Sequence, residues 1–360
     1  MKTKDILRVV VVMSTLLVGC ENLGEWDQQP ADNAITFSLE NSMLSLRTLV
    51  TSENVNSGTA PVYVAAVVGK DRLYPVDTKN SKGEQITRNT TTNKWSPKTT
   101  NNTKNWENDK EYSFNAFSYL PTTATSDGSL SFASNTYGWG ITVTQPNTYT
   151  PDKMVDYLYS HTFKCNGTTR PIVKLDLQHA LSLVEVRIAK HESIEEAYLE
   201  KVTLNGFYRT ANMECSAATY MSGANNEWRV SFPSGATKDT SYSVSGGDPT
   251  KTSSGLIPLT VREDAGSIVL SFIAVPQQMD SSVKLLVSYW VNEKFNSSSA
   301  DNFKQHTAEF QLYNYSPNSW ASGHRITYSL VVDTGIHLEG VIRDWIETDY
   351  IEGTVLPDVE

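Results

Sequence analysis

The chain has 360 residues, of which 39% are hydrophobic and 19% charged, a composition typical of folded domains rather than of disordered chains. Its formal net charge is −10 at pH 7, and no segment clusters Lys and Arg, so neither nucleic acid nor a polybasic contact with lipid is expected. Because the length exceeds the usual extent of one hydrophobic core, the sequence predicts two domains.

The N-terminus has the charge pattern of a bacterial export signal. Three basic residues and one acidic residue precede an uncharged run, residues 9–19, which is too short to span a bilayer and ends directly before Cys20. A small residue followed by Cys at this point resembles the lipobox of bacterial lipoproteins, in which the Cys thiol is diacylated. We therefore expect a signal peptide over residues 1–19 and a lipid on Cys20 that anchors the chain at the outer membrane, facing outward. The alternative is an ordinary signal peptide with a chance Cys.

Beyond the signal, apolar residues recur at every second position, which is the pattern of β-strands. In residues 184–188 the polar face carries Glu185 and Arg187. Clusters of Ser, Thr, Asn and Gly separate such segments and predict turns. The alternation is clear in four segments, which are residues 34–39, 184–188, 283–291 and 326–332.

This spacing predicts an all-β fold of two tandem antiparallel β-sandwich domains. We place them at residues 48–192 and 193–360, after an N-terminal tether of residues 20–47. The boundary lies at the one segment with a helical signal, where Ser193 and Glu196 form a candidate capping box ahead of one or two helical turns.

Two cysteines besides Cys20 remain after the signal. Cys165 and Cys215 would face an oxidising exterior, where a disulfide is chemically allowed. They fall in different predicted domains, and single buried thiols are common in sheets. The sequence therefore leaves open whether the two are bridged.

The sequence contains no complete catalytic or metal-binding motif. His191 and Glu192 begin like the zincin helix motif, but Glu195 stands where the second His must lie to reach the same metal. The phosphate-binding loop and nucleophile-elbow patterns do not occur. We therefore expect no catalytic residue, no metal ligand and no cofactor, and we do not expect an enzyme.

One tryptophan is a candidate for ligand contact. Trp139 lies between Gly138 and Gly140, where an exposed indole ring could stack on a sugar. The alternative for this residue is an aromatic side chain packed in a loop. Trp139 supports a second functional interpretation of the chain, a surface glycan-binding lipoprotein of a nutrient-uptake system.

Four segments spread along the chain are similar to those of a known family. Residues 173–182, preceded by the aromatic segment at residues 156–159, match a family strand with the pattern Phe-x-His-Ala-Leu, except that Leu177 replaces the Phe. The others are residues 112–121, 274–278 and 320–328. In these segments the chain resembles the fimbrillin-like lipoproteins of Bacteroidota, the type V pilin group. The resemblance implies transthyretin-like topology, a role in building or tipping a surface fimbria, and no catalytic role for His179.

The resemblance also implies assembly by strand donation. A protease removes the first strand of the exported precursor, and the extended tail of another subunit fills the groove that is left. Residues 34–39 are the candidate first strand. Their alternating apolar side chains are Ile35, Phe37 and Leu39.

Arg47 is the candidate processing site. It is the only basic residue between Cys20 and Lys70, so a trypsin-like protease has a single target there, the Arg47-Thr48 bond. A cut at that bond would release the subunit from its lipid. The alternative is that Arg47 is a solvated loop charge in a lipoprotein that is never cut.

The C-terminal tail, residues 336–360, is the candidate donor strand or, equally, the last strand of the second sandwich. The expected partners are other fimbrial subunits in a homopolymer or heteropolymer, the outer membrane through the lipid, and a host or bacterial surface receptor. The sequence does not distinguish a shaft, tip or anchor subunit. The candidate donor side chains are Ile336, Leu338, Ile342 and Trp345.

Overall fold

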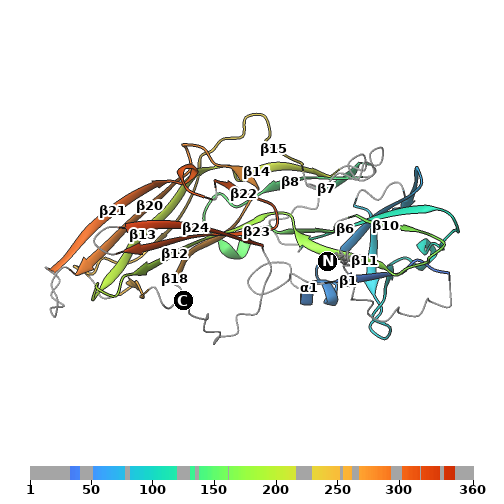
Figure 1. Ribbon diagram of the computed structural model, residues 1–360, viewed down its shortest axis with the longest axis horizontal. Coiled ribbons are helices and arrows are strands. Elements are labelled where there is room, and N and C mark those ends of the chain that lie inside the picture. The colour runs from blue at the N-terminus through green and yellow to red at the C-terminus, as the bar shows by residue number, and fades with distance from the viewer. Residues whose placement is uncertain are drawn as a thin grey trace, which may run out of the picture.

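The molecule is built almost entirely from β-strands. The computed structural model describes residues 33–40, 52–77, 82–119, 130–133, 138–160, 162–215, 229–251, 254–261, 267–292, 302–316, 318–332 and 336–344. Within them the helices are α1 (Ser52–Ser57) and the short 3₁₀ turns η1 (Thr100–Asn102), η3 (Pro151–Lys153) and η6 (Leu312–Asn314). The predicted all-β class is confirmed. The molecule is elongated, and its N-terminal strands lie at one end (Figure 1).

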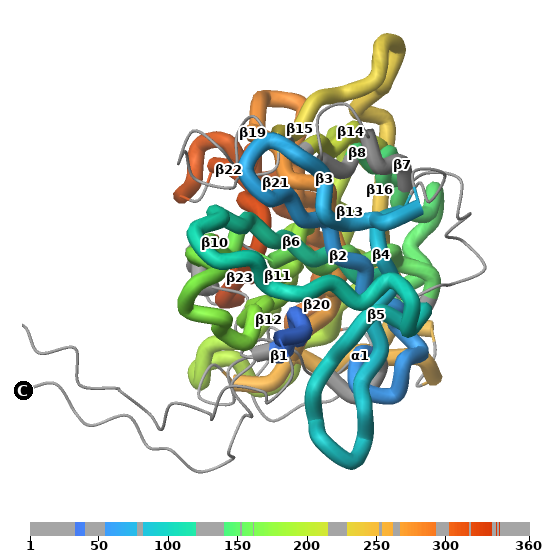
Figure 2. The backbone as a smooth tube through the Cα atoms, turned by 90° about the vertical axis from the view of Figure 1, so that its right-hand side faces the viewer, coloured from blue at the N-terminus to red at the C-terminus, as the bar shows by residue number. Residues whose placement is uncertain are grey.

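The N-terminal end consists of one sheet that closes on itself. Its order is β10-β6-β9-β11-β1-β5-β4-β2-β3, and β6 also pairs with β2, so the strands from β6 round to β2 form a ring. Figure 2 shows this end facing the viewer. The bounds are β1 (Phe37–Glu40), β2 (Val62–Val68), β3 (Asp71–Tyr74), β4 (Glu84–Arg88), β5 (Trp95–Pro97), β6 (Glu111–Tyr119), β9 (Tyr157–Ser160), β10 (Phe163–Asn166) and β11 (Val173–His179). Each strand of the ring therefore has a neighbour on both sides.

Alternate residues of β6 face two different cores. Tyr112, Phe114 and Ala116 are buried in the cluster of the N-terminal sheet. Phe117 and Tyr119 belong to the larger cluster, which the N-terminal sheet shares with the rest of the molecule. Because a strand points successive side chains to opposite faces, this aromatic strand joins the two cores.

The described part of the remaining chain forms four sheets around the larger core. One has the order β18 (Ser267–Ala274), β12 (Ser182–Lys190), β23 (His324–Val332), β24 (Ile336–Asp344). A second has the order β16 (Thr240–Ser245), β13 (Ala197–Phe207), β20 (Lys284–Asn292), β21 (Phe303–Gln311), with β17 (Ile257–Pro258) also on β13. The others are β15 (Arg229–Ser231), β14 (Thr210–Cys215), β8 (Gly138–Thr144), β7 (Leu130–Ala133), and the pair β19 (Gln277–Gln278), β22 (Ser319–Trp320).

The strands predicted at residues 184–188, 283–291 and 326–332 are confirmed as β12, β20 and β23. The short helix predicted after Ser193 is wrong, because β13 begins at Ala197 and pairs with β20 from its first residue. A capping box states only a local preference, and the burial of alternate residues of β13 outweighs it.

Strand pairing differs from the predicted division of the chain near residue 192. β12 precedes that boundary but pairs with β18 and β23, and β8 pairs with β14. The two-sandwich arrangement and its boundary stay predictions, and the N-terminal sheet departs from an open sandwich by closing into a ring.

Cys165 on β10 carries a free thiol, so it is not bridged to Cys215. Burial, with a smaller contribution from Glu111, raises the pKa of this thiol to about 12.

Candidate functional site: the slot of the first strand

The candidate first strand lies in the middle of the N-terminal sheet rather than at an edge. β1 runs parallel to β11, with Phe37 opposite Val173 and Glu40 opposite Asp176. On its other side it pairs with β5 at one position only, Phe37 opposite Trp95. We call the space that β1 fills between β11 and β5 the slot.

Hydrogen bonds extend the contact just before β1. The Ile35 N–H donates to the carbonyl of Lys104 at 2.8 Å, and the Trp106 N–H donates to the carbonyl of Asn33 at 2.9 Å. The Asn33 side-chain amide returns a bond to the Trp106 carbonyl at 2.8 Å. On the opposite side, the Val173 N–H donates to the Thr36 carbonyl at 2.9 Å. These bonds precede β1, and the parallel pairing of β1 with β11 continues the attachment along the strand.

Side chains at and just before β1 are buried in the slot. Ile35 and Phe37 are both 0% exposed within the aromatic core of the sheet. The Phe37 ring lies 6.2 Å from that of Tyr74 and packs edge-on against Phe114 at 5.9 Å between ring centroids. Leu39 is partly buried against the same core. Phe37 therefore fills the centre of the slot.

Tyr74 lines the slot, and its hydroxyl is shielded from solvent. Burial raises the pKa of Tyr74 well above its usual range, although its oxygen accepts a hydrogen bond from the Lys104 N–H at 3.2 Å. Such desolvation requires tight packing around the ring, with Phe37 among its neighbours. The slot is therefore lined by buried aromatic side chains, which suits an extended strand with apolar residues on one face.

A family model described as fimbrillin-like matches residues 48–345 of the chain. The chain belongs to the fimbrillin-like family. No curated protein is similar enough to this fimbrillin-like protein to count as a match.

This fimbrillin-like protein is similar to solved structures of low sequence identity, one of which has the same overall fold. A fimbrial protein from Bacteroides vulgatus has a TM-score of 0.56 at 12% identity, with 87% of this chain and 100% of that chain covered. Two candidate cell adhesion proteins follow. The one from Bacteroides uniformis has a TM-score of 0.47 at 12% identity over 88% of this chain and 100% of that chain. The one from Bacteroides ovatus has a TM-score of 0.45 at 17% identity over 88% and 98%.

Several predicted site residues of the fimbrillin-like chain fall beyond the part that the structure describes. Cys20, Arg47, Thr48 and Trp345 lie outside the described residues, so lipid attachment and processing stay predictions. Trp139 lies on β8 opposite Cys215, but its side chain is likewise outside the described part. The glycan-binding interpretation is therefore untested.

The candidate donor residues Ile336, Leu338 and Ile342 lie on β24. This strand forms one end of its sheet and pairs antiparallel with β23 along its length, from Ile336 opposite Val332 to Asp344 opposite His324. Ile336 and Leu338 pack against the larger core. The described strand is therefore an integral strand of this sheet, and its role as a donor stays a prediction.

His179 lies buried at the end of β11. Its Nδ1 is 2.9 Å from the Asp156 carboxylate, and the two side chains are 1% and 2% exposed. The pair ties β11 to the residue preceding β9. This agrees with a structural role in the core, as the resemblance implied for His179.

Sequence reasoning did not find the walls of the slot. Tyr74, Trp95 and Trp106 come from separate segments, and no spacing pattern links them to β1. Their local sequences indicate only turns or short strands. The one available signal was the presence of aromatic residues in these turns and short strands. That signal does not specify which strand the aromatic side chains surround.

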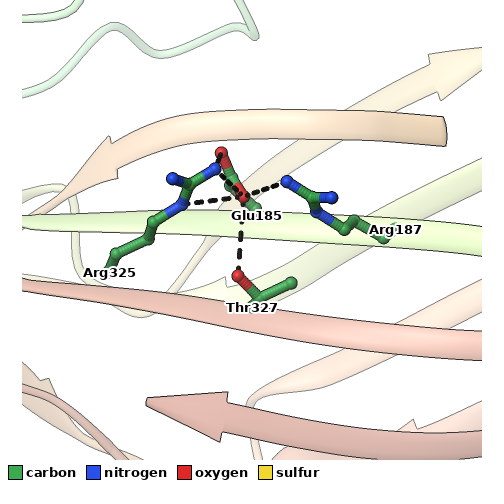
Figure 3. Close-up of polar contacts among 4 residues, drawn as sticks. All are labelled: Glu185, Arg187, Arg325 and Thr327. Atoms are coloured by element: carbon green, nitrogen blue, oxygen red, sulfur yellow. Dashed lines mark hydrogen bonds and ion pairs between the residues drawn. The ribbon is translucent and has the colours of Figure 1, made fainter. Parts of the chain in front are cut away.

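A buried ion cluster was also missed (Figure 3). Glu185 on the polar face of β12 is 4% exposed and accepts hydrogen bonds from Arg325 Nε at 3.1 Å and Arg325 Nη2 at 2.9 Å. Arg187 and Thr327 each reach the same carboxylate at 3.5 Å. Because Arg325 and Thr327 belong to β23, the cluster fixes the parallel pairing of β12 with β23.

Among the residues that the structure describes, no group of three or more His, Cys, Asp or Glu side chains is arranged to hold a metal ion. No helix in that part of the chain has the length and apolar character needed to cross a membrane.

Proposed function

We propose that this fimbrillin-like protein is a structural or adhesive subunit of a cell-surface fimbria, exported as a lipoprotein and assembled by strand donation. The observation that carries the proposal is the position of β1, whose Phe37 is fully buried between two strands of the ring. Arg47 follows β1 and precedes α1 in the chain. A cut at Arg47-Thr48 would therefore separate the slot-filling strand from the sheet that surrounds it.

The energetics favour refilling an empty slot. Burial of side chains such as Ile35 and Phe37 contributes about 1.5–3 kcal/mol each, and an unfilled slot would also leave the backbone of β11 and β5 unpaired. By β-augmentation, an extended segment from another subunit can restore both the burial of apolar side chains and the backbone pairing. The family match supports the role as a fimbrial subunit, because the matching family is described as fimbrillin-like.

The first experiment determines the N-terminus of the protein recovered from the cell surface. We expect Thr48 in assembled fimbriae and diacylated Cys20 in the unprocessed precursor. Arg47→Gln should leave every copy acylated and prevent assembly, whereas Lys70→Gln, which removes the next basic residue, should leave processing unchanged. Acylated Cys20 on all copies of the wild-type protein would overturn the processing step.

The second experiment tests the tail. A chain ending at Asp344 keeps all of β24, whereas a chain ending at Gly340 loses part of its pairing with β23. If residues 345–360 act as the donor, the chain ending at Asp344 should fold normally and fail to polymerise. The alternative is that β24 itself leaves β23 and acts as the donor. In that case the chain ending at Gly340 should fold but remain a monomer. Normal polymerisation of both truncated chains would eliminate the tail as donor.

A further inference from the structure

Three polar atoms around β1 are buried without a hydrogen-bond partner. They are Asn33 Oδ1, Thr36 Oγ1 and Trp106 Nε1. Two belong to the segment that fills the slot, and the third belongs to the residue whose backbone pairs with Asn33. In folded proteins most buried polar atoms are paired, so this grouping at one strand calls for a physical explanation.

At Thr36 the unpaired atom is the side-chain hydroxyl, on the face of the segment opposite Ile35 and Phe37. Ile35 and Phe37 are completely buried and fit the aromatic core, so the apolar side of the slot is well filled. The Thr36 carbonyl accepts a bond from the Val173 N–H. The side-chain hydroxyl of Thr36 is the group that lacks a partner. A valine has nearly the same shape and lacks that hydroxyl.

We propose that the slot is built for a strand more apolar than the one it holds. A strand with an apolar, β-branched side chain at the place of Thr36 binds the slot more tightly than the resident β1, and a donor strand of another subunit carries such a residue. The resident segment then acts as a replaceable occupant. This proposal rests on the proposed function, since it specifies the partner of the same slot.

The slot preference can be measured first in the uncut chain, with no need for assembly. We expect Thr36→Val to raise the folding equilibrium constant of the N-terminal sheet about 5-fold, which corresponds to ~1 kcal/mol for removing one unpaired buried hydroxyl. Thr87→Val is the matched control, because Thr87 lies exposed on β4 of the same sheet. A gain at Thr36 no larger than the gain at Thr87 would overturn the proposal.

The second measurement uses the mature chain cut between Arg47 and Thr48. Synthetic peptides of residues 33–47 compete with the fluorescently labelled resident segment for the slot. We expect the Thr36→Val peptide to displace it at about 5-fold lower concentration than the unchanged peptide. A Phe37→Ala peptide should not compete. Equal displacement by the Thr36→Val and unchanged peptides would overturn the inference.

The two measurements separate failure of the inference from failure of the proposed function. If Thr36→Val stabilises the uncut chain but no peptide enters the cut chain, strand donation into this slot is wrong while the preference of the slot stands. If peptides enter the slot without preferring valine, strand donation stands and the inference is wrong.

Discussion

The two strands at the ends of the described chain are held in different ways. β1 lies between β11 and β5, pairs with β11 along its length and with β5 at a single position, and buries Phe37 completely, while Ile35 is fully buried just before it. β24 has one described neighbour, pairs with it from Ile336 to Asp344, and contributes partly buried side chains to the core. Complete burial of side chains thus adds to the main-chain pairing of β1, whereas β24 combines a longer main-chain pairing with side chains that are only partly buried. Removing β1 opens an aromatic slot, whereas removing β24 exposes the edge of β23 and the part of the core that Ile336 and Leu338 cover.

The largest expected effect comes from the centre of the slot. Phe37→Ala should destabilise the N-terminal sheet by about 3–5 kcal/mol, because it removes a fully buried ring and leaves a cavity between Tyr74 and Phe114. Urea denaturation followed by tryptophan fluorescence measures the loss. Ser38→Ala, at the next position on the opposite face of β1, is the control and should change stability little. A loss below ~1 kcal/mol for Phe37→Ala would mean that main-chain pairing dominates at β1.

A smaller effect is expected where β23, the neighbour of β24, is joined to β12. Glu185→Gln should cost about 2 kcal/mol, because the change leaves the Arg325 guanidinium beside a neutral group on a largely covered face. The matched control is Glu309→Gln, which breaks an exposed ion pair with Lys284 and should cost ~0.5 kcal/mol or less. Equal losses for the two variants would show that the cluster does not secure the sheet that carries β24.

The smallest effect is a pH dependence in the half of the molecule that contains β24. The hydrogen bond from Lys238, followed by that from Ser282, lowers the pKa of Asp280 to about 2. The ionised carboxylate therefore favours the folded state above about pH 4, and this contribution disappears as the pH falls from about 4 to about 2. Because Asp280 is 54% exposed, we expect no more than ~0.5 kcal/mol.

Lys238→Met should reduce that acid-induced loss, measured as the difference in unfolding free energy between pH 6 and pH 2.5. Lys201→Met, at an exposed position on β13, is the control and should retain the full dependence. An unchanged pH dependence in Lys238→Met would show that the Asp280 contact does not contribute in solution.

Some features of the fold follow directly from local sequence. The alternation in residues 184–188, 283–291 and 326–332 predicted three strands that the structure contains. The same alternation identified Ile35 and Phe37 as residues of one buried face. It could not indicate that β12 pairs with β18 and β23, because period two defines the faces of a strand and not its neighbours.

Other features depended on contacts between distant segments. Glu185 occupies the polar face of its strand, yet Arg325, 140 residues later, covers it. The helical signal at Ser193 was overruled because Ala197 and Leu199 become buried when β13 pairs with β20. In both cases the deciding energy came from packing that no local pattern encodes.

The order of residue types within short segments is enough to predict the all-β class, the buried face of the first strand and a lipid on Cys20. Contacts in the folded molecule establish that β1 lies inside a closed ring, that Tyr74, Trp95 and Trp106 enclose it, and that β24 lies beside β23. No short segment encodes these features, because strand pairing and burial are energies of contact between segments far apart in the chain.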